Sequence, residues 1–531
     1  LQGEFDAGTG RELFSYVPRI SLPGQKDLRL IGDHSFTIDG RVSHGDVFID
    51  PVHDGIPTVN DREWRSVFIG GMREGGKGYF AIDYTQPDTL DDCNGRPVIP
   101  EPETGARNWV PSCLDGGAGC GTAPFATPLW EFEDNTDCGI QLADGYCDDD
   151  ANGIADIGDS WSAPVIGRIL VLADDGTTSE DLHVAIFGGG MDPDRKGMAD
   201  AEGNHLYMVD IETGRKIYKR PVEGSIPMEV AAVDTDQNGY FDTIYFGTTL
   251  GIMYKVDLSA PQPLVDNGLG PRVIAPEWDP CPIFVDPGMP FYYPPSVIFV
   301  PELGKYSISW GGGEREDLWE VTQRPGRIYM LLDNDFKCGD PSLPRTVVDL
   351  QPILPDDPCT DVDYLRQPPY GWYIELEEEE RTLNRTFSLA GVTVISTYQP
   401  EQSIGQGGGV CVRSGDSRTF VVNTTSACGL LPSDDPNNLD RYFVIEGGFL
   451  SSPFVETGQT KNPSGGGDDG PTADDIPDDL VSVMGEIRKL FPDDCRFANY
   501  TINIKAVRDD TGIQFLAAIP ICTVETNWRD F

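Results

Sequence analysis

The sequence predicts an all-β fold of the β-propeller type, and three observations support this prediction. Apolar segments that end in glycine recur along the chain at a spacing of roughly 60 residues, a period typical of propeller blades. Each is followed closely by a second apolar segment that ends in aspartate. Gly and Pro are frequent, with 61 and 43 of the 531 residues, as expected where many short strands alternate with turns.

The predicted repeat consists of a strand with a closing glycine, a loop, a second strand that ends in Asp, a turn and a third strand. The glycine-terminated strands are Val67–Gly71, Val184–Gly189, Ile244–Gly247 and Ile308–Gly312. The strands that follow them are Tyr79–Asp83, Tyr207–Asp210, Tyr254–Asp257 and Tyr329–Asp333. Because one such sheet cannot bury both of its faces, several must pack around a common axis.

Both ends of the chain have strand-like patterns as well. Residues Phe5–Pro18 form a strand-turn-strand phrase that recurs at Tyr207–Tyr218. Near the C-terminus, Tyr500–Val507 alternates polar and apolar side chains, and Gln514–Ile519 follows after a turn, which predicts a hairpin. We therefore expect a single propeller domain over residues 1–531. Insertions are expected at about residues 86–160, 258–300, 334–370 and 456–490.

One short helix is predicted near the C-terminus, within Leu480–Leu490. Its apolar residues follow a helical spacing; they are Leu480, Val483, Met484, Ile487 and Leu490. Residues 456–479, which precede it, are mainly Gly, Asp and Pro with almost no large apolar side chains. That composition predicts a flexible acidic segment.

The segment from Ala232 to Gly247 has the spacing of a calcium-binding loop. Side-chain oxygens stand at alternate positions, Gly239 permits a sharp turn, and a further carboxylate follows three residues later. The twelfth position, where a helix-loop-helix calcium hand has a bidentate carboxylate, is Tyr245 within an apolar, β-branched run, so we expect the loop to lead into a strand. The predicted ligands are Asp234, Asp236, Asn238, the carbonyl of Tyr240, and Asp242.

The same spacing occurs a second time, in the insertion at residues 86–160. In this loop the twelfth position is Asp159, so its carboxylate could complete the ligand set as the twelfth residue of a calcium hand does. Carboxylates this close together repel one another, and a divalent cation relieves that repulsion. The predicted ligands are Asp148, Asp150, Asn152, the carbonyl of Ile154, Asp156 and Asp159. The cofactor is therefore expected to be Ca²⁺, as one or two ions.

Twelve cysteines form an even set without a Cys-x-x-Cys pair or a Cys/His cluster of zinc spacing. Several lie in segments rich in Gly, Asp and Pro, where a cross-link restrains the chain. We expect most to form disulfides in an oxidising compartment, the periplasm or the cell surface. Cys411–Cys428 and Cys495–Cys522 are plausible local pairs.

Composition excludes some classes of partner. The net charge of −48, from 39 basic and 87 acidic residues, argues against nucleic acid and against anionic membranes. No apolar run of about 18 residues occurs, so no membrane-spanning helix is expected. The first residue is Leu1 and no signal-peptide pattern precedes it, so we expect a processed product or a piece of a longer protein.

Several phrases of the sequence together resemble the C-terminal propeller of PilY-type proteins, the adhesins and assembly factors at the tip of type IV pili. The phrases, spread over about residues 1–450, are specific as a collection although none is so alone. Apart from the Asp234 loop, they are Phe5–Pro18, His34–Gly40, Trp64–Gly71, Gly75–Asp83, Trp161–Gly167, Gly371–Ile374 and Thr397–Pro400.

The resemblance implies a modified propeller of about seven blades at the pilus tip. It implies that the Asp234 loop binds calcium, whose occupancy governs whether pili stay extended. The implied partners are minor pilins within the tip complex and a host or abiotic surface, reached after export through the periplasm. The Asp148 loop is not part of the family's pattern, and the sequence contains no Arg-Gly-Asp tripeptide for integrin binding.

The main alternative is an enzyme, a quinone-dependent dehydrogenase of the eight-bladed propeller class, which also uses calcium. Such enzymes place a vicinal disulfide and a stacking Trp around the quinone, and this sequence has no Cys-Cys dipeptide. The paired acidic residues of both loops suit metal ligation better than general acid–base catalysis. We therefore assign no catalytic residue and expect a protein that is not an enzyme.

A third alternative is a purely structural scaffold in which calcium only rigidifies the loops. It differs from a calcium switch in affinity. Micromolar binding would permit reversible control, whereas tighter binding would make the ion a permanent part of the fold.

Overall fold

The computed structural model is nearly all β-strand, and the only α-helix among the described residues is the four-residue α1 (Leu22–Gln25). The all-β prediction is thereby confirmed, whereas the number of blades stays a prediction. The chain divides into two compact units, each described by itself: Leu1–Ile244 with Lys255–Pro280, and Tyr245–Tyr254 with Cys281–Phe531. The structure describes residues 15–25, 36–50, 62–85, 127–173, 176–266, 271–273, 276–316, 324–333, 336–354, 359, 369–400, 415–431, 439–445, 454–459, 500–508 and 512–520.

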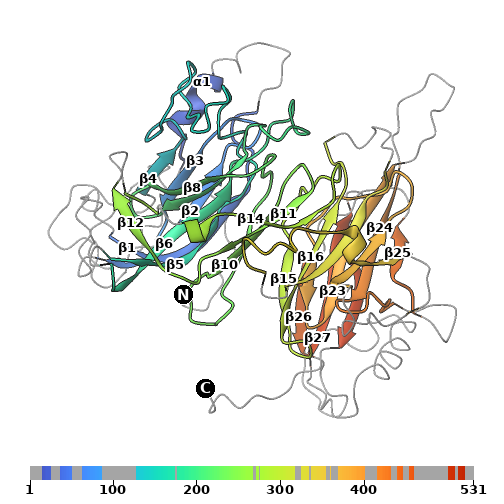
Figure 1. Cartoon of the computed structure of the whole chain (residues 1–531). Helices are drawn as coiled ribbons and strands as arrows, with labels where there is room; N and C mark the ends of the chain where they lie inside the picture. Colours follow the sequence, from blue (N-terminus) through green and yellow to red (C-terminus); the bar gives the residue numbers. More distant parts are fainter. Residues whose placement is uncertain are drawn as a thin grey trace, which may run out of the picture. The chain divides into compact units, whose positions relative to one another are not determined.

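The first unit contains two sheets in which consecutive strands pair antiparallel (Figure 1). One has the order β1-β2-β3-β4, and the other continues from β5 to β8, with β12 parallel to β5 and β13 antiparallel to β12. The first set is β1 (Val42–Ile49), β2 (Glu63–Gly71), β3 (Tyr79–Asp83) and β4 (Thr127–Phe132). The second is β5 (Val165–Leu172), β6 (Ser179–Gly188), β7 (His205–Asp210), β8 (Lys216–Pro221), β12 (Gln262–Asp266) and β13 (Pro271–Val273).

The second unit contains three further sheets, ordered β15-β16-β17-β20-β19, β21-β23-β24-β25 with β22 on β23, and β26-β27-β28. The last includes the antiparallel hairpin β27–β28, which confirms the hairpin predicted for the tail (Figure 1). The strands are β15 (Ser296–Val300), β16 (Lys305–Gly312), β17 (Arg327–Asp333), β19 (Gln351–Ile353), β20 (Gly371–Glu375), β21 (Arg381–Thr382), β22 (Phe387–Leu389), β23 (Val392–Pro400), β24 (Gly415–Asn423), β25 (Tyr442–Ile445), β26 (Phe454–Gln459), β27 (Tyr500–Arg508) and β28 (Gly512–Pro520).

Short elements complete the described chain. The parallel pair β14–β18 belongs to the second unit. The short strands are β9 (Ala231–Val233), β10 (Thr243–Gly247), β11 (Ile252–Asp257), β14 (Cys281–Val285) and β18 (Arg345–Thr346). The 3-10 turns are η1 (Arg19–Ser21), η4 (Pro276–Trp278) and η5 (Val347–Asp349). The helix predicted at Leu480–Leu490 and the acidic segment before it lie outside the described residues, except for the end of β26.

The repeated sequence phrase corresponds to a repeated packing unit. In three repeats, the aromatic residue just before the closing glycine stacks on a Tyr near the start of the following strand. Ring centroids are 5.6 Å apart for Phe187 and Tyr207, 5.4 Å for Phe246 and Tyr254, and 5.0 Å for Trp310 and Tyr329, with interplanar angles of 13°, 12° and 15°. Such pairs contribute about 0.5–1.5 kcal/mol beyond the area that they bury. The stack explains why the sequence pattern recurs.

Buried apolar residues of both sheets form the core of the first unit. They come from alternate positions of β1, β2, β3, β6 and β7, since successive side chains of a strand point to opposite faces. Ile157, which follows the second predicted calcium loop, belongs to this core. The loop is thus anchored to the sheets at its C-terminal end.

Three disulfides lie within the described residues: Cys138–Cys147, Cys281–Cys338 and Cys359–Cys428. They confirm the disulfide-bearing insertions. The predicted pair Cys411–Cys428 is wrong, because Cys428 bonds to a cysteine 69 residues away that the fold brings to it. The pair Cys495–Cys522 lies outside the described residues.

His183 on β6 makes the first unit sensitive to acid. Its Nε2 accepts the N–H of Phe48 at 3.3 Å, so the ring is held neutral, and burial lowers its pKa to about 4. Because the unfolded chain binds this proton near pH 6.5, stability present above that pH is lost as the pH falls toward 4. We expect the melting temperature of the wild type to fall about 5–10 °C further than that of His183→Gln between pH 7 and pH 4.5.

The control for this prediction is His44→Gln, because His44 is exposed on β1. Calorimetric scans at both pH values should give the same pH dependence for this variant as for the wild type. Parallel pH profiles for His183→Gln and the wild type would contradict the assignment.

Candidate metal sites

The first predicted loop joins β9 to β10 and brings its three carboxylates together. One oxygen from each of Asp234, Asp236 and Asp242 lies within 4.8 Å of the other two. Two oxygens that bind one calcium ion at about 2.3–2.6 Å lie at most about 5 Å apart. The spacing of the carboxylates therefore fits a single ion.

Backbone N–H groups of the first loop turn inward toward these carboxylates. Asn238 donates its N–H to Asp234 Oδ1 and Asp236 Oδ1, both at 3.1 Å, and Gly239 donates to Asp234 Oδ2 at 2.7 Å. Gln237 and Gly239 both have positive φ angles, of 60° and 90°. Gly239 adopts this conformation without strain because it has no Cβ atom. These left-handed residues produce the turn that the sequence predicted at Gly239.

The second loop, between the Cys138–Cys147 disulfide and the core residue Ile157, repeats these contacts. Its Asn152 N–H is donated to Asp148 Oδ1 at 3.0 Å and Asp150 Oδ1 at 3.2 Å, and Gly153 N–H to Asp148 Oδ2 at 2.9 Å. One oxygen from each of Asp148, Asp150 and Asp156 again lies within 4.8 Å of the others. The matching hydrogen bonds indicate that the two loops share one backbone shape.

The remaining predicted ligands have different placements. Tyr240 and Ile154 occupy equivalent positions, and each donates its N–H to the side-chain oxygen of the loop's asparagine, at 2.9 and 2.8 Å. Asp159 is not among the three clustered carboxylates of its loop. It pairs by its backbone with Met191, and burial raises the pKa of its carboxyl to about 6, with Lys77 acting in the opposite direction.

The donor set decides which ion suits these loops. All of the clustered groups are carboxylates, and the asparagine side chains and loop carbonyls offer further oxygens. Hard oxygen donors in a flexible loop suit Ca²⁺, whereas zinc prefers nitrogen and sulfur ligands. The residues present therefore fit calcium.

A buried network of charges surrounds the second loop and was not predicted from the sequence. Lys219 on β8 donates to Asp149 Oδ2 at 2.8 Å, lies 2.8 Å from Asp134 Oδ2, and also donates to Asp156. Lys216 pairs with the other oxygen of Asp134. Both lysines are less than a tenth exposed. No sequence signal pointed to them, because β8 carries Arg220 as well as the two lysines.

The pKa values of this network follow from burial and from the two ammonium groups. Burial opposes ionisation of Asp134, but Lys216 and Lys219 outweigh it and lower the pKa of that carboxyl. Burial raises the pKa of Asp156 to about 6 despite its contact with Lys219. Burial also lowers the pKa of His205 to about 3, so its ring beside Asp156 is neutral.

Gly167 on β5 packs against Phe241 of the first loop. A Cβ atom at this position would lie 2.1 Å from the ring of Phe241, which directly precedes Asp242. We expect Gly167→Ala to displace Phe241 and with it Asp242, and to weaken calcium binding at this loop about 10–100-fold, as changes behind metal ligands do. Calorimetric titration of calcium into the chelator-treated variant measures this loss.

The matched control is Gly197→Ala, because a Cβ atom there meets no atom within 4 Å. Its calcium affinity should equal that of the wild type. An unchanged affinity for Gly167→Ala would show that Phe241 does not position the loop.

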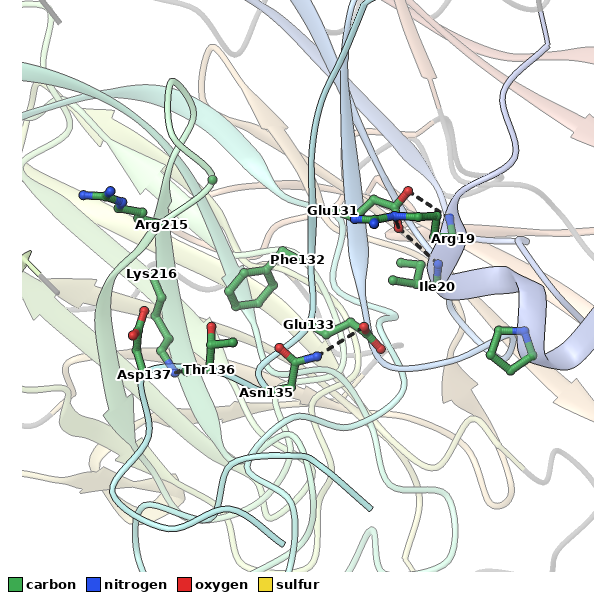
Figure 2. A pocket seen from close by; sticks show the side chains of 12 residues that line it. Arg19, Ile20, Glu131, Phe132, Glu133, Asn135, Thr136, Asp137, Arg215 and Lys216 are labelled. Carbon is green, nitrogen blue, oxygen red and sulfur yellow. Dashed lines mark hydrogen bonds and ion pairs between the residues drawn. The ribbon is translucent and has the colours of Figure 1, made fainter. Parts of the chain in front are cut away.

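A pocket of about 490 Å³ lies in the first unit, beside η1, the end of β4 and the β7–β8 turn (Figure 2). Two of its polar residues, Glu131 and Lys216, make hydrogen bonds. Glu131 accepts the N–H groups of Arg19 and Ile20 at 2.8 and 3.1 Å and the Tyr16 hydroxyl at 2.6 Å. Lys216 donates to the carbonyl of Thr136 at 3.2 Å. The hydrogen bonds of Glu131 therefore hold the segment around η1 against β4.

Comparisons with known proteins agree with this fold. No family model matches the chain. It is 24% identical over 462 residues to a type IV pilus biogenesis factor PilY1 homolog of Xylella fastidiosa, covering 78% of this chain and 25% of that protein. It is 20% identical over 408 residues to type IV pilus biogenesis factor PilY1 of Pseudomonas aeruginosa, covering 70% and 28%. The chain thus spans about a quarter of the length of these relatives.

A solved structure is similar over nearly the whole chain. The crystal structure of the Pseudomonas aeruginosa PilY1 C-terminal domain superimposes with a TM-score of 0.52 and 16% sequence identity, covering 96% of this chain and 89% of that one. At this identity the likeness establishes the fold.

Proposed function

We propose, from the premise that this chain is a PilY-type C-terminal domain, that it is a calcium-binding part of the type IV pilus tip. In this role it supports pilus biogenesis, the control of extension and retraction, and adhesion to a host or abiotic surface. Its partners are minor pilins of the tip complex. The chemistry is metal ligation, and no residue is assigned to catalysis.

The observation that carries the proposal is the pair of matching loops. Each supplies three carboxylates whose oxygens lie within 4.8 Å of one another. Calcium would bind Asp234, Asp236 and Asp242 in the first loop and Asp148, Asp150 and Asp156 in the second. An ion bound there supplies two positive charges, which relieve the mutual repulsion of the carboxylates and fix the loop.

A location at the cell surface is consistent with the cross-links. The described residues contain three disulfides, and such bonds persist in oxidising compartments such as the periplasm and the cell exterior. Among those residues, no helix is both long and apolar enough to cross a bilayer. The net charge of −48 disfavours a nucleic-acid partner.

The experiment is deletion of the coding region in the bacterium that makes this protein, followed by complementation. We expect the deletion to abolish surface pili, counted by electron microscopy, and twitching motility on agar, and the wild-type gene to restore both. Normal piliation and motility after deletion would refute the assignment to the pilus. A featureless absorbance spectrum above the protein band would separately exclude a bound quinone and the dehydrogenase alternative.

Calcium affinity separates the switch from the structural scaffold. Titration of the chelator-treated protein should give dissociation constants near the micromolar range if binding controls extension reversibly. Binding that is tighter by several orders of magnitude would instead support a permanently bound ion.

A further inference from the structure

We infer that Lys219 gives the two loops different calcium dependence: its ammonium takes over part of the ion's role in the second loop. That loop therefore keeps its shape without calcium and binds the ion more weakly than the first. The inference rests on the proposed calcium binding and adds a regulation of those sites. It makes the first loop the one that responds to changes in calcium.

The contacts of Lys219 support this assignment. The loop carries four aspartates, and the ammonium donates to two of them, to Asp149 Oδ2 at 2.8 Å and to Asp156. Asp156 is the carboxylate that also closes the loop, because it accepts the N–H of Asp149 at 2.8 Å. Lys219 is buried and is held from behind by Asp134 at 2.8 Å. The positive charge is therefore fixed at the loop.

In the first loop, the carboxylate equivalent to Asp156 is Asp242, and its hydrogen-bond donors are neutral. Asp242 Oδ2 accepts the N–H and hydroxyl of Thr235 at 2.8 and 2.7 Å, and its Oδ1 accepts the hydroxyl of Thr243 at 2.8 Å. Within the described residues, no ion pair reaches Asp234, Asp236 or Asp242. The nearby Arg168 guanidinium stacks on the ring of Tyr240 at 4.8 Å.

Covalent and backbone ties also favour a preformed second loop. The disulfide Cys138–Cys147 ends one residue before Asp148. Both loops are closed by a matching backbone bond, from Asp156 to Cys147 at 2.9 Å and from Asp242 to Val233 at 3.0 Å, so the disulfide is what differs. The cross-linked segment binds the loop a second time, because Gly139 donates its N–H to Asp149 Oδ1 at 2.8 Å. No disulfide within the described residues adjoins the first loop.

Electrostatics then predicts the order of the two affinities. Without an ion, the carboxylates of the first loop repel one another, and no ion pair within the described residues offsets this repulsion. In the second loop, the lysine already relieves part of the repulsion and also repels the incoming cation. We expect the second loop to bind calcium at least about tenfold more weakly, the lower end of the effect of groups behind metal ligands.

Hydrogen exchange of the wild-type chain, with calcium and with chelator, tests the inference directly. We expect amide exchange at residues 234–242 to rise at least about tenfold on chelation, and exchange at residues 148–156 to change less than about twofold. Equal increases at both loops would overturn the inference and leave calcium binding intact. If neither loop responds and titration shows no binding, the proposed calcium function itself fails, and the inference with it.

The variant Lys219→Met tests the role of the charge, with Asp234→Asn present so that only the second loop can bind. We expect calcium affinity to rise at least about tenfold and exchange at residues 148–156 to become dependent on calcium. A merely structural lysine would give weaker binding, which would contradict the inference. Lys305→Met is the control, because it removes a lysine from β16 in the second unit, whereas both loops belong to the first. The wild-type exchange experiment decides the question if Lys219→Met does not fold.

Discussion

Asp234→Asn is expected to lower calcium affinity at the first loop at least about 100-fold, which corresponds to about 2.7 kcal/mol. Changes behind metal ligands already cost about 10–100-fold, and Asp234 is itself a proposed ligand. It also organises the loop, because it accepts the N–H groups of Asn238 and Gly239 at 3.1 and 2.7 Å. Calorimetric titration of the chelator-treated variant measures the loss.

The matched control is Glu180→Gln, which removes the same charge from an exposed position of β6. Its titration should superimpose on that of the wild type. In the bacterium, the Asp234→Asn gene should fail to restore normal control of pilus extension to the deletion strain, whereas Glu180→Gln should restore it. Wild-type affinity in Asp234→Asn would remove the first loop from the list of calcium sites.

Asp134→Ala is expected to destabilise the first unit by about 3–5 kcal/mol, the usual cost of removing one partner of a buried ion pair. The carboxylate is 1% exposed and pairs with both Lys216 and Lys219. It also accepts the hydroxyl of Tyr207 at 2.8 Å. Its removal takes one carboxylate away from two buried ammonium groups and leaves the buried Tyr207 hydroxyl without this acceptor. Calorimetry should therefore record a lower melting temperature.

Glu180→Ala is the control for this second prediction, since exposed positions away from special contacts usually change stability by less than about 0.5 kcal/mol. A similar melting temperature for Asp134→Ala and Glu180→Ala would mean that water or a rearranged side chain compensates Lys216. The disulfide Cys138–Cys147 should remain intact in both variants, which a thiol assay checks.

Local spacing predicted which carboxylates lie together. The ligands of each loop stand within nine residues, so the backbone turn at Gly239 or Gly153 is enough to bring them together. The repeated strands were predictable for a similar reason, because their glycine and Tyr positions form a contact between neighbouring strands. The number of blades stays a prediction, and the insertions obscure the period on which it rests.

The surroundings of the second loop depend on distant residues and could not be predicted. Lys219 lies 70 residues from Asp149 and 63 from Asp156, and only the packing of β8 brings them into contact. The position of Asp159 could not be predicted from sequence spacing either. Its place in the sequence suggests a twelfth ligand, but its pairing with Met191 determines where its carboxyl lies. Sequence spacing therefore predicts the residues within a loop, but not the distant residues that pack against it.

The disulfides of the second unit bear on how this protein, in the proposed position at the pilus tip, would respond to pulling. Cys281–Cys338 and Cys359–Cys428 close segments of 57 and 69 residues. At about 3.4 Å per extended residue, they withhold roughly 190 and 230 Å of contour length from a chain under tension. A pulled tip protein would therefore yield in short steps, and its cross-linked segments would stay compact until a reductant opened them.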